Sequence, residues 1–362
     1  MGNKRKLLPF IDEVLNTIQK DMEKTKLNIG DGFSGSGIVS RLFKKYANNL
    51  YTNDLAGYST TLNKCYLSNP TAKAETQIKN YVDEANRLAD SAGSQIIRNP
   101  WISKHWAPKK TDIAANERAY FTHENGRRID VIRDYIETIP TKMKPFVLAP
   151  LLVESSIHNN TNGNFAAYYK DGNDKGAYGG KNGVDVKRIT QPITLPYPIF
   201  SNEKCKVHIS QMDTNDWAKS LSDQTELDVV YYDPPYNKHP YNIYYFLLDI
   251  INDWDKTIDI PENYRGQPPD RKKSSYNSSI HAKAAMENLI ANTRARYIIL
   301  SYNNGGIIPV HELDKMLEKY ATHVDKIPID HKTYNRLKGL SNYKRTTESK
   351  DVKELLYVIK MK

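Results

Sequence analysis

The chain has few of the residues on which several classes of protein depend. It holds only two cysteines, Cys65 and Cys205, and neither lies in a Cys-x-x-Cys or Pro-Cys pair. The sequence therefore gives no support for a disulfide framework, a zinc cluster or a Pro-Cys nucleophile. The nine histidines show no metal-type spacing such as His-Glu-x-x-His, so we predict no metal site.

Long apolar runs are also missing. The basic start of the chain leads into only "LLPFI" before Asp12 and Glu13, which is too short for the apolar region of a secretory signal. No run approaches the roughly 18 apolar residues that suggest a membrane helix. We therefore expect a cytoplasmic protein with no membrane partner.

Positive charge is abundant, and there are enough apolar residues for a core. Lys and Arg number 52 against 42 Asp and Glu, which gives a net charge of +10, and 39% of the residues are hydrophobic. This balance favours a polyanionic partner, nucleic acid above all, although genome bias can also produce it. A chain of 362 residues predicts two domains, or one large domain with an insertion.

Strand and helix patterns alternate in two stretches of the chain. An amphipathic helix near the N-terminus precedes a strand at 27–33, a glycine turn, a helix from Ile38 and a strand that ends at Asp54. From residue 206 onward, the strands "KVHIS", "DVVYY", "RYIILSY" and "ELLYVIK" are separated by helical segments. This alternation predicts an α/β fold with a mostly parallel, doubly wound sheet. Residues 66–198 interrupt it with a basic, aromatic and loop-rich region.

The glycine turn "DGFSGSG" (Asp31 to Gly37) follows the first strand. Glycines let a ligand approach the backbone closely, and the next helix offers its N-terminus. Asp54 lies 19 residues after Gly35, a spacing at which an acid can bind ribose hydroxyls. The pattern predicts a nucleoside-type cofactor, and an ordinary turn is the alternative.

The stretch "YYDPPYNKHPY" raises a similar question. The strand "DVVYY" must stop at Pro234 and Pro235, because two backbone donors are lost and two φ angles are fixed. Asp233 and Tyr236 are thereby held on a rigid corner at the carboxyl end of a strand, where α/β sheets bind ligands. The alternative is a simple diproline turn with a capping aspartate.

Together these motifs resemble the Dam-like (alpha-group) adenine-specific DNA methyltransferase family of the DPPY type. The segments "GNKRKLLPFI", "DGFSGSGIVSRLF", "YTNDLAGYS", "DPPYNKHPYN" and "ILSYNN" occur in that family's order, and "YKRTTESKDVKELLYVIK" is similar to its C-terminal strands. The resemblance implies a Rossmann-like methyltransferase sheet from residues 1–65 and 199–362. It also implies S-adenosylmethionine as cofactor and residues 66–198 as an inserted target-recognition region.

The resemblance implies roles for single residues as well. The cofactor-binding candidates are Asn3, Lys4, Asp31, Phe33, Ser34, Gly35, Gly37, Asp54 and Asp213. The catalytic candidates are Asp233, Pro234, Pro235 and Tyr236. Asp54 would bind the ribose and Asp213 the cofactor's adenine amine, although a solvated loop acid is the alternative for Asp213. Asp233 and the carbonyl of Pro234 would accept the protons of the substrate adenine's amine, and Tyr236 would stack on a base that has left the duplex.

Basic residues of the insertion are the DNA-binding candidates. The stretch "THENGRR" combines an Asn-Gly turn with Arg127 and Arg128, which suit phosphates or guanine edges. The other candidates are Lys104, Lys109 and Lys110. A solvated basic surface around buried tryptophans is the alternative for each of them.

We therefore expect a site-specific adenine amino-methyltransferase acting on double-stranded DNA. It would be either a solitary methylase or the partner of a cognate restriction endonuclease in a restriction-modification system. An aspartate before Pro-Pro-Tyr favours adenine but also occurs in cytosine amino-methylating enzymes. The alternatives are methylation of RNA, of a cytosine amine or of a protein glutamine, and a catalytically silent DNA-binding relative.

Overall fold

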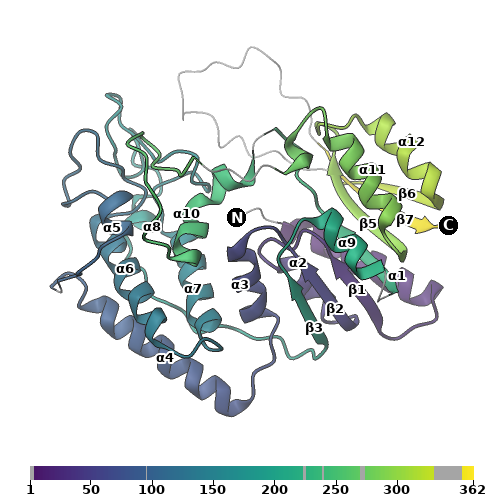
Figure 1. Ribbon diagram of the computed structural model, residues 1–362, viewed down its shortest axis with the longest axis horizontal. Coiled ribbons are helices and arrows are strands. Elements are labelled where there is room, and N and C mark those ends of the chain that lie inside the picture. The colour runs from purple at the N-terminus through teal and green to yellow at the C-terminus, as the bar shows by residue number, and fades with distance from the viewer. Residues whose placement is uncertain (1–3, 95, 223–225, 239, 270–273, 330–352) are drawn as a thin grey trace. The chain divides into compact units, whose positions relative to one another are not determined.

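The computed structural model describes residues 4–94, 96–222, 226–238, 240–269, 274–329 and 353–362. The chain divides into two compact units, shown in Figure 1. The sheet unit comprises Gly2–Leu55, Glu203–Pro240 and Lys273–Lys362, and the helical unit comprises Ala56–Asn202 and Tyr241–Lys272. Within the described residues, no helix is long and apolar enough to cross a membrane.

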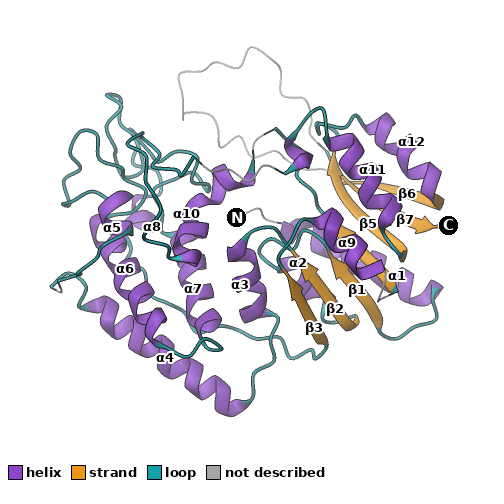
Figure 2. Ribbon diagram, viewed as in Figure 1, coloured by secondary structure: helices purple, strands orange, loops and turns teal. Residues whose placement is uncertain are grey.

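Seven strands form the sheet of the sheet unit, in the order β3-β2-β1-β4-β5-β7-β6. Their bounds are β1 Leu27–Asp31, β2 Ala47–Asn53, β3 Lys206–Ser210, β4 Leu227–Tyr232, β5 Ala295–Asn303, β6 Ala321–Ile329 and β7 Glu354–Met361. The first five strands in this order pair in parallel, and β7 runs antiparallel to both β5 and β6. Figure 2 shows the strands gathered in this unit.

The strand register places polar residues at the ends of several strands along one edge of the sheet. Asp31, the last residue of β1, pairs with Thr52 of β2 and with Tyr231 of β4. Because β7 runs in the opposite direction, its first residue, Glu354, lies opposite Asn303, the last residue of β5. The carboxyl ends of the parallel strands and the amino end of β7 therefore share this edge.

Helices cover both faces of the sheet, which explains why the central strands are almost wholly apolar. The helices of this unit are η1 Lys4–Leu7, α1 Leu8–Asp21, α2 Ile38–Phe43, α9 Thr214–Ser222, η2 Ser275–Asn277, α11 Ala282–Asn292 and α12 Val310–Tyr320. Helices α9, α11 and α12 pack on one face, where Trp217, Met286 and Leu313 join a core with Val230 and Ile298. Helix α2 packs on β1 and β2 and contacts η1 and α1, and all six residues of β4 are buried.

The helical unit has a separate aromatic and aliphatic core. Its helices are α3 Gly57–Tyr66, α4 Ala72–Asp90, α5 Ile102–His105, α6 His123–Thr138, α7 Lys144–Ile157, α8 Val186–Thr190 and α10 Tyr241–Asp253. Trp106, Tyr120, Phe165 and Phe246 are buried together in it, with Trp106 and Phe246 in edge-to-face contact at 6.5 Å between ring centroids. Long loops connect the short helices α5 and α8 to the rest.

The α/β fold class and the main strands are confirmed, but two local predictions differ. Strand β6 was not expected, and "THENGRR" forms no Asn-Gly turn. Thr122 caps α6, since its hydroxyl accepts from the Asn125 N–H at 3.1 Å, so Asn125 and Gly126 lie in the helix's first turn. Gly126 allows close packing there, because a Cβ would lie 2.7 Å from the Ala107 Cβ. Residues 343–352 of the predicted C-terminal motif lie outside the described residues.

Candidate active site

The glycine loop between β1 and α2 is shaped by several close constraints. Gly35 and Gly37 have φ angles of +49° and +74°, which side-chain-bearing residues rarely adopt. At Gly32 a Cβ would lie 2.5 Å from the Tyr232 ring, whereas a Cβ on Gly35 would meet nothing within 4 Å. The loop is thus packed at its start and open at Gly35, where a ligand could reach the backbone.

Asp54 closes this loop from the end of β2. Its Oδ2 accepts a hydrogen bond from the Gly35 N–H at 2.8 Å. The Ser34 N–H donates to the carbonyl of Asn53 at 3.0 Å. The 19-residue spacing seen in the sequence therefore corresponds to a direct contact between the acid and the glycine loop.

The loop after β3 is tied to the same place by residues that the sequence analysis did not single out. Asn53 donates to the Met212 carbonyl at 3.0 Å and accepts from the Met212 N–H at 3.2 Å. The Thr214 hydroxyl donates to the Gly32 carbonyl at 2.9 Å. Asp213, between them, accepts from the Asn215 N–H at 2.8 Å and so caps α9. In the sequence, only the position of Asn53 at the end of a predicted strand could have indicated that it holds the loop after β3.

Asp31 is a buried carboxylate with one unsatisfied oxygen. Its Oδ2 accepts from the Ser40 hydroxyl at 2.5 Å, while its Oδ1 has no hydrogen-bond partner among the described residues. Burial raises the pKa of Asp31 to about 7; the Ser40 hydroxyl and, more weakly, the Phe33 backbone N–H oppose this rise, and the nearby carboxylates of Asp54 and Asp233 add to it. An unsatisfied buried oxygen is costly, and a cationic or N–H-bearing ligand would relieve that cost.

The Asp-Pro-Pro-Tyr corner follows β4 directly. Asp233 is partly buried, with 17% of its side chain exposed, and Pro234 is buried. The Tyr236 carbonyl accepts from the Ile307 N–H at 2.9 Å, and its ring meets the Tyr302 ring edge-on at 6.3 Å. The corner is therefore anchored to the segment that follows β5.

Lys4 brings positive charge to this corner. Its Nζ lies 2.9 Å from Asp233 Oδ1, 3.0 Å from Ser301 Oγ and 5.8 Å from the centroid of the Tyr236 ring, and it also pairs with Glu354. Burial raises the pKa of Asp233 and Lys4 opposes that rise, with the net pKa above the ordinary value. Burial alone would lower the pKa of Lys4, but Asp233, Tyr231 and Glu354 raise it overall. At neutral pH the lysine is therefore charged.

Ser301 and Glu354 were missed by the sequence analysis. Glu354 opens an apolar strand, "ELLYVIK", and its side chain is only 9% exposed. An acid at the start of a buried strand is the one signal that could have marked it, because buried carboxylates require partners.

The predicted cofactor and catalytic residues of the sheet unit meet at one edge of the sheet. Contacts join Gly35 to Asp54 and Lys4 to Asp233, and Asp31 is electrostatically coupled to both carboxylates. Phe33 packs edge-on against Tyr276 at 5.4 Å, near the same loop. Asn3 lies outside the described residues.

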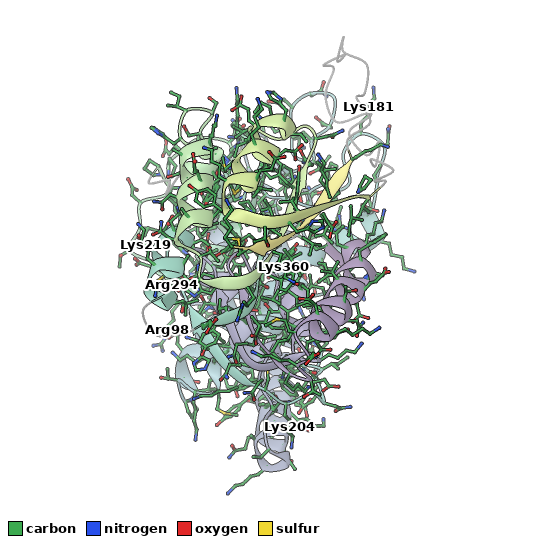
Figure 3. All side chains as sticks on the ribbon, turned by 90° about the vertical axis from the view of Figure 1, so that its right-hand side faces the viewer. Arg98, Lys181, Lys204, Lys219, Arg294 and Lys360 are labelled. Carbon is green, nitrogen blue, oxygen red and sulfur yellow. The ribbon has the colours of Figure 1, made fainter. Side chains whose placement is uncertain are left out.

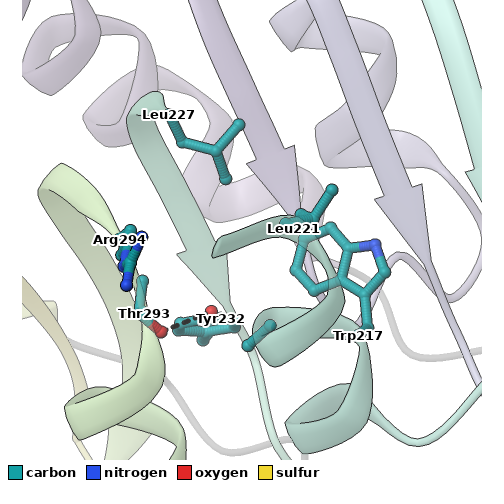
Figure 4. Close-up of a pocket in the computed structure, with 7 residues that line it drawn as sticks. Trp217, Leu221, Leu227, Tyr232, Thr293 and Arg294 are labelled. Carbon is teal, nitrogen blue, oxygen red and sulfur yellow. Dashed lines mark hydrogen bonds between the residues drawn. The ribbon is translucent and has the colours of Figure 1, made fainter. Parts of the chain in front are cut away.

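A small pocket nearby is a different feature. It lies between α9 and β4 and is lined mainly by apolar side chains such as Trp217, Leu221 and Leu227 (Figure 4). The only hydrogen bond drawn there joins Tyr232 to Thr293 at 2.8 Å. None of the predicted cofactor or catalytic residues lines this pocket, so it is a packing gap rather than the candidate site.

The predicted DNA-binding arginines of the helical unit are engaged internally. Arg128 is 4% exposed, and its guanidinium donates to the carbonyls of Ile193 (2.7 Å) and Ala89 (3.1 Å) and pairs with Asp90 (2.8 Å). Arg127 donates twice to the Ala92 carbonyl. Arg128 thus adds a side-chain donor to the Ala89 carbonyl near the end of α4, which also accepts from the Ala92 N–H, and Arg127 reaches the Ala92 carbonyl just beyond that helix. The side chain predicted to contact DNA at Arg128 is therefore buried in this structure and held by acceptors of the protein itself.

The lysine candidates are placed differently. Lys104, Lys109 and Lys110 are exposed, whereas Trp101 and Trp106 are buried. Exposed basic side chains occur on both units, however. Figure 3 labels Lys204, Lys219, Arg294 and Lys360 of the sheet unit and Arg98 and Lys181 of the helical unit. Net charge alone therefore does not locate a nucleic-acid surface.

The fold and the site together define a methyltransferase-type α/β enzyme, with a glycine loop, an acid after β2 and an Asp-Pro-Pro-Tyr corner after β4. The family model of D12 class N6 adenine-specific DNA methyltransferase matches residues 1–316. The chain belongs to this family. The resemblance seen in the sequence, the fold class and the enzyme class are thus confirmed.

Named relatives support the same assignment. The chain is 26% identical to the type II methyltransferase M.NlaIII of Neisseria lactamica, covering 99% of this chain and 98% of that protein. It is 25% identical to the modification methylase StsI of Streptococcus sanguinis and 27% identical to the type II methyltransferase M.FokI of Planomicrobium okeanokoites. The matches cover 100% and 99% of this chain but 52% of each of those two proteins. DNA methyltransferases in general use S-adenosylmethionine.

Proposed function

We propose that this chain methylates the exocyclic amine of adenine at a specific sequence in double-stranded DNA, with S-adenosylmethionine as methyl donor. The observation that carries the proposal is the position of Asp233. Its carboxylate is held on a rigid diproline corner, at the same sheet edge as the glycine loop and Asp54. The names of the relatives support a restriction-modification context, with a cognate endonuclease as partner.

The residues of the sheet unit fit the proposed cofactor. The unsatisfied Oδ1 of Asp31 suits a cationic or amino group, and the open backbone at Gly35 leaves room for a ligand. We assign four residues of the glycine loop to the methionine part of the cofactor, namely Phe33, Ser34, Gly35 and Gly37, and we retain Lys4 as a further cofactor-binding candidate. We assign Asp54 to the ribose and Asp213 to the adenine amine. When bound, S-adenosylmethionine supplies a sulfonium-activated methyl group.

Asp233 is the residue that activates the adenine amine for methyl transfer. The exocyclic amine of adenine is a poor nucleophile because its lone pair is delocalised into the ring. Hydrogen bonds from the amine to Asp233 and to the Pro234 carbonyl localise that lone pair, and Asp233 can accept the proton that the amine loses. Pro235 fixes the geometry, and the ring of Tyr236 offers a stacking surface for a base that has left the duplex. Orientation is then the main source of rate.

The helical unit is the proposed target-recognition part. We propose residues 66–198 as the inserted region that reads DNA, with Lys104, Lys109 and Lys110 contacting phosphates. The helical unit as observed also includes residues 56–65 and 241–272, so its core is completed by chain from beyond the insertion.

The test is modification-sensitive sequencing of DNA from a methylation-free host that expresses the chain, beside an Asp233→Ala control. Methyladenine at one recurring short motif, absent from the control, would establish the reaction and its specificity. Methylcytosine at such a motif would show that the substrate base is cytosine and not adenine. Unmodified DNA from a well-expressed protein would direct the search to RNA.

A further inference from the structure

Lys4 sits in a closed arrangement of side chains that the proposed reaction does not yet explain. The Ser301 hydroxyl accepts from Lys4 at 3.0 Å and itself donates to Glu354 Oε1 at 2.9 Å, and that same carboxylate oxygen pairs with Lys4. Asp233 Oδ1 approaches the ammonium at 2.9 Å. A lysine ammonium has three donors, and here it meets three acceptors.

This arrangement is built into the sheet. Ser301 belongs to β5, Asp233 follows β4, which pairs with β5, and Glu354 begins β7 on the other side of β5. The register pairs Ser301 with Leu356 and Asn303 with Glu354. The positions of the three acceptors are therefore set by backbone hydrogen bonds, and not by the conformation of one loop.

The burial of Glu354 needs a reason. A carboxylate in an apolar strand is costly unless it is paired and hydrogen-bonded, and the chemistry assigned to Asp233 does not require it. If Asp233 were the only partner of Lys4, the ammonium would compete with the substrate amine for the same carboxylate. Glu354 and Ser301 take two of the three ammonium donors and hold Lys4 at Asp233 Oδ1.

We propose that Glu354 and Ser301 are positioning residues that hold the Lys4 ammonium against Asp233 Oδ1, so that Asp233 presents Oδ2, and not Oδ1, to the substrate amine. This inference rests on the proposed function. It assigns the proton lost by the amine to Asp233 Oδ2, while Lys4 remains protonated throughout.

The charges around Asp233 predict a pH signature. The titratable groups that act on it or are coupled to it are Lys4, Asp31, Tyr231, Tyr236 and Glu354. Burial raises the pKa of Asp233 most, Lys4 lowers it and Glu354 raises it. In Glu354→Gln the negative charge is gone, and Asp233 becomes the one carboxylate left for Lys4. Both changes lower the pKa of Asp233, so the acid limb of the rate profile should move to lower pH.

The experiment measures single-turnover methyl transfer from S-adenosylmethionine to a DNA duplex carrying the recognised motif, from pH 5 to 9 with both ligands saturating. For Glu354→Gln we expect a rate about 10- to 100-fold lower, as for a slightly misplaced catalytic group, and an acid limb at lower pH. The dissociation constants of S-adenosylhomocysteine and DNA should stay within about twofold, since orientation and not binding is lost.

Three further variants separate positioning from folding. Glu354→Asp should recover part of the rate, and Ser301→Ala should slow transfer without moving the acid limb, because it removes no charge. Glu287→Gln is the matched control: this acid of α11 pairs with Lys319 at 2.9 Å in the same unit, and its loss should leave rate and profile unchanged.

A double-mutant cycle completes the test. If Glu354 acts through Lys4, then Glu354→Gln should cost little in a Lys4→Met background. The inference would be overturned if Glu354→Gln lowered the rate equally in the wild-type and Lys4→Met backgrounds. It would also be overturned if Glu354→Gln weakened cofactor and DNA binding together with the rate and left the acid limb unmoved. A wild-type protein that transfers no methyl group to adenine would instead refute the proposed function, so the two failures are distinguishable.

Discussion

Both units of this protein bury a basic side chain against oxygen atoms, but the partners differ. In the sheet unit, Lys4 meets the carboxylates of Asp233 and Glu354 and the hydroxyl of Ser301. In the helical unit, Arg128 meets two backbone carbonyls and the carboxylate of Asp90. The carbonyls of Ala89, near the end of α4, and of Ile193, beyond α8, act there only as hydrogen-bond acceptors. The partners, and not the charge, separate a site residue from a structural one.

The largest effect should come from the sheet unit. Asp233→Ala should lower the single-turnover rate by about 10²- to 10⁴-fold, the usual range for a lost acid-base group. Lys4 would keep Glu354 and Ser301 as partners, so the fold and the binding of S-adenosylhomocysteine should be retained. Rapid-quench kinetics and calorimetry measure the two effects. Turnover near that of the wild type would refute the role of Asp233.

In the helical unit, the largest effect should be on stability. Arg128→Met removes a buried guanidinium and its hydrogen bond to the Ile193 carbonyl, whereas the Ala89 carbonyl keeps the Ala92 N–H, so the substitution should cost about 1–3 kcal/mol of unfolding free energy. Urea denaturation measures the loss. Arg87→Met is the control, because this exposed arginine of α4 pairs with Glu84 at the surface and its removal should leave stability unchanged. A stable Arg128→Met protein with weakened DNA binding would restore the original DNA-binding role.

The exposed lysines of the helical unit should behave in the opposite way. Replacing Lys104, Lys109 and Lys110 together by glutamine should leave stability unchanged and weaken DNA binding by about tenfold at moderate salt. The slope of log affinity against log salt should become shallower by about 2 to 3, as expected when up to three phosphate contacts are lost. Fluorescence anisotropy at several salt concentrations measures this.

The matched control removes two exposed lysines of α4, Lys73 and Lys79. This control variant loses two positive charges, against three in the triple variant, and should keep the wild-type slope. If the triple variant also kept that slope, the DNA-reading surface would lie elsewhere in the protein.

The two units also differ in how far the sequence predicts them. The glycine loop, Asp54 and Asp233 were predicted because each follows a strand, and parallel strands bring their carboxyl ends to one edge. Ser301 and Glu354 were missed because their role depends on β7 lying antiparallel beside β5, which no local pattern reveals. The Asn-Gly turn was wrongly predicted because a capping threonine, Thr122, starts a helix there, and Arg128 lies buried on that helix. Local chemistry is readable from sequence, whereas long-range pairing and burial are not.

Asp31 offers the finest test of the site, since its role is to bind and not to react. Its pKa is raised to about 7 by burial, so part of the free protein holds a neutral carboxylic acid at neutral pH. A cationic ligand group near Oδ1 would favour the ionised form. The affinity for S-adenosylmethionine should therefore fall by up to about tenfold per pH unit below pH 7 and level off above it. Isothermal titration between pH 6 and 8 measures this dependence.

The Asp31→Asn variant should separate binding from stability. A carboxyl with a raised folded-state pKa binds its proton more tightly when folded, so stability falls as the pH rises from about 4 to 7. The asparagine lacks this loss, so the variant should melt at a higher temperature than the wild type at pH 8. It should also bind the cofactor more weakly, with a flatter pH dependence. A pH-independent affinity in the wild type would mean that Oδ1 of Asp31 faces no cationic group of the cofactor, and that its burial serves the fold alone.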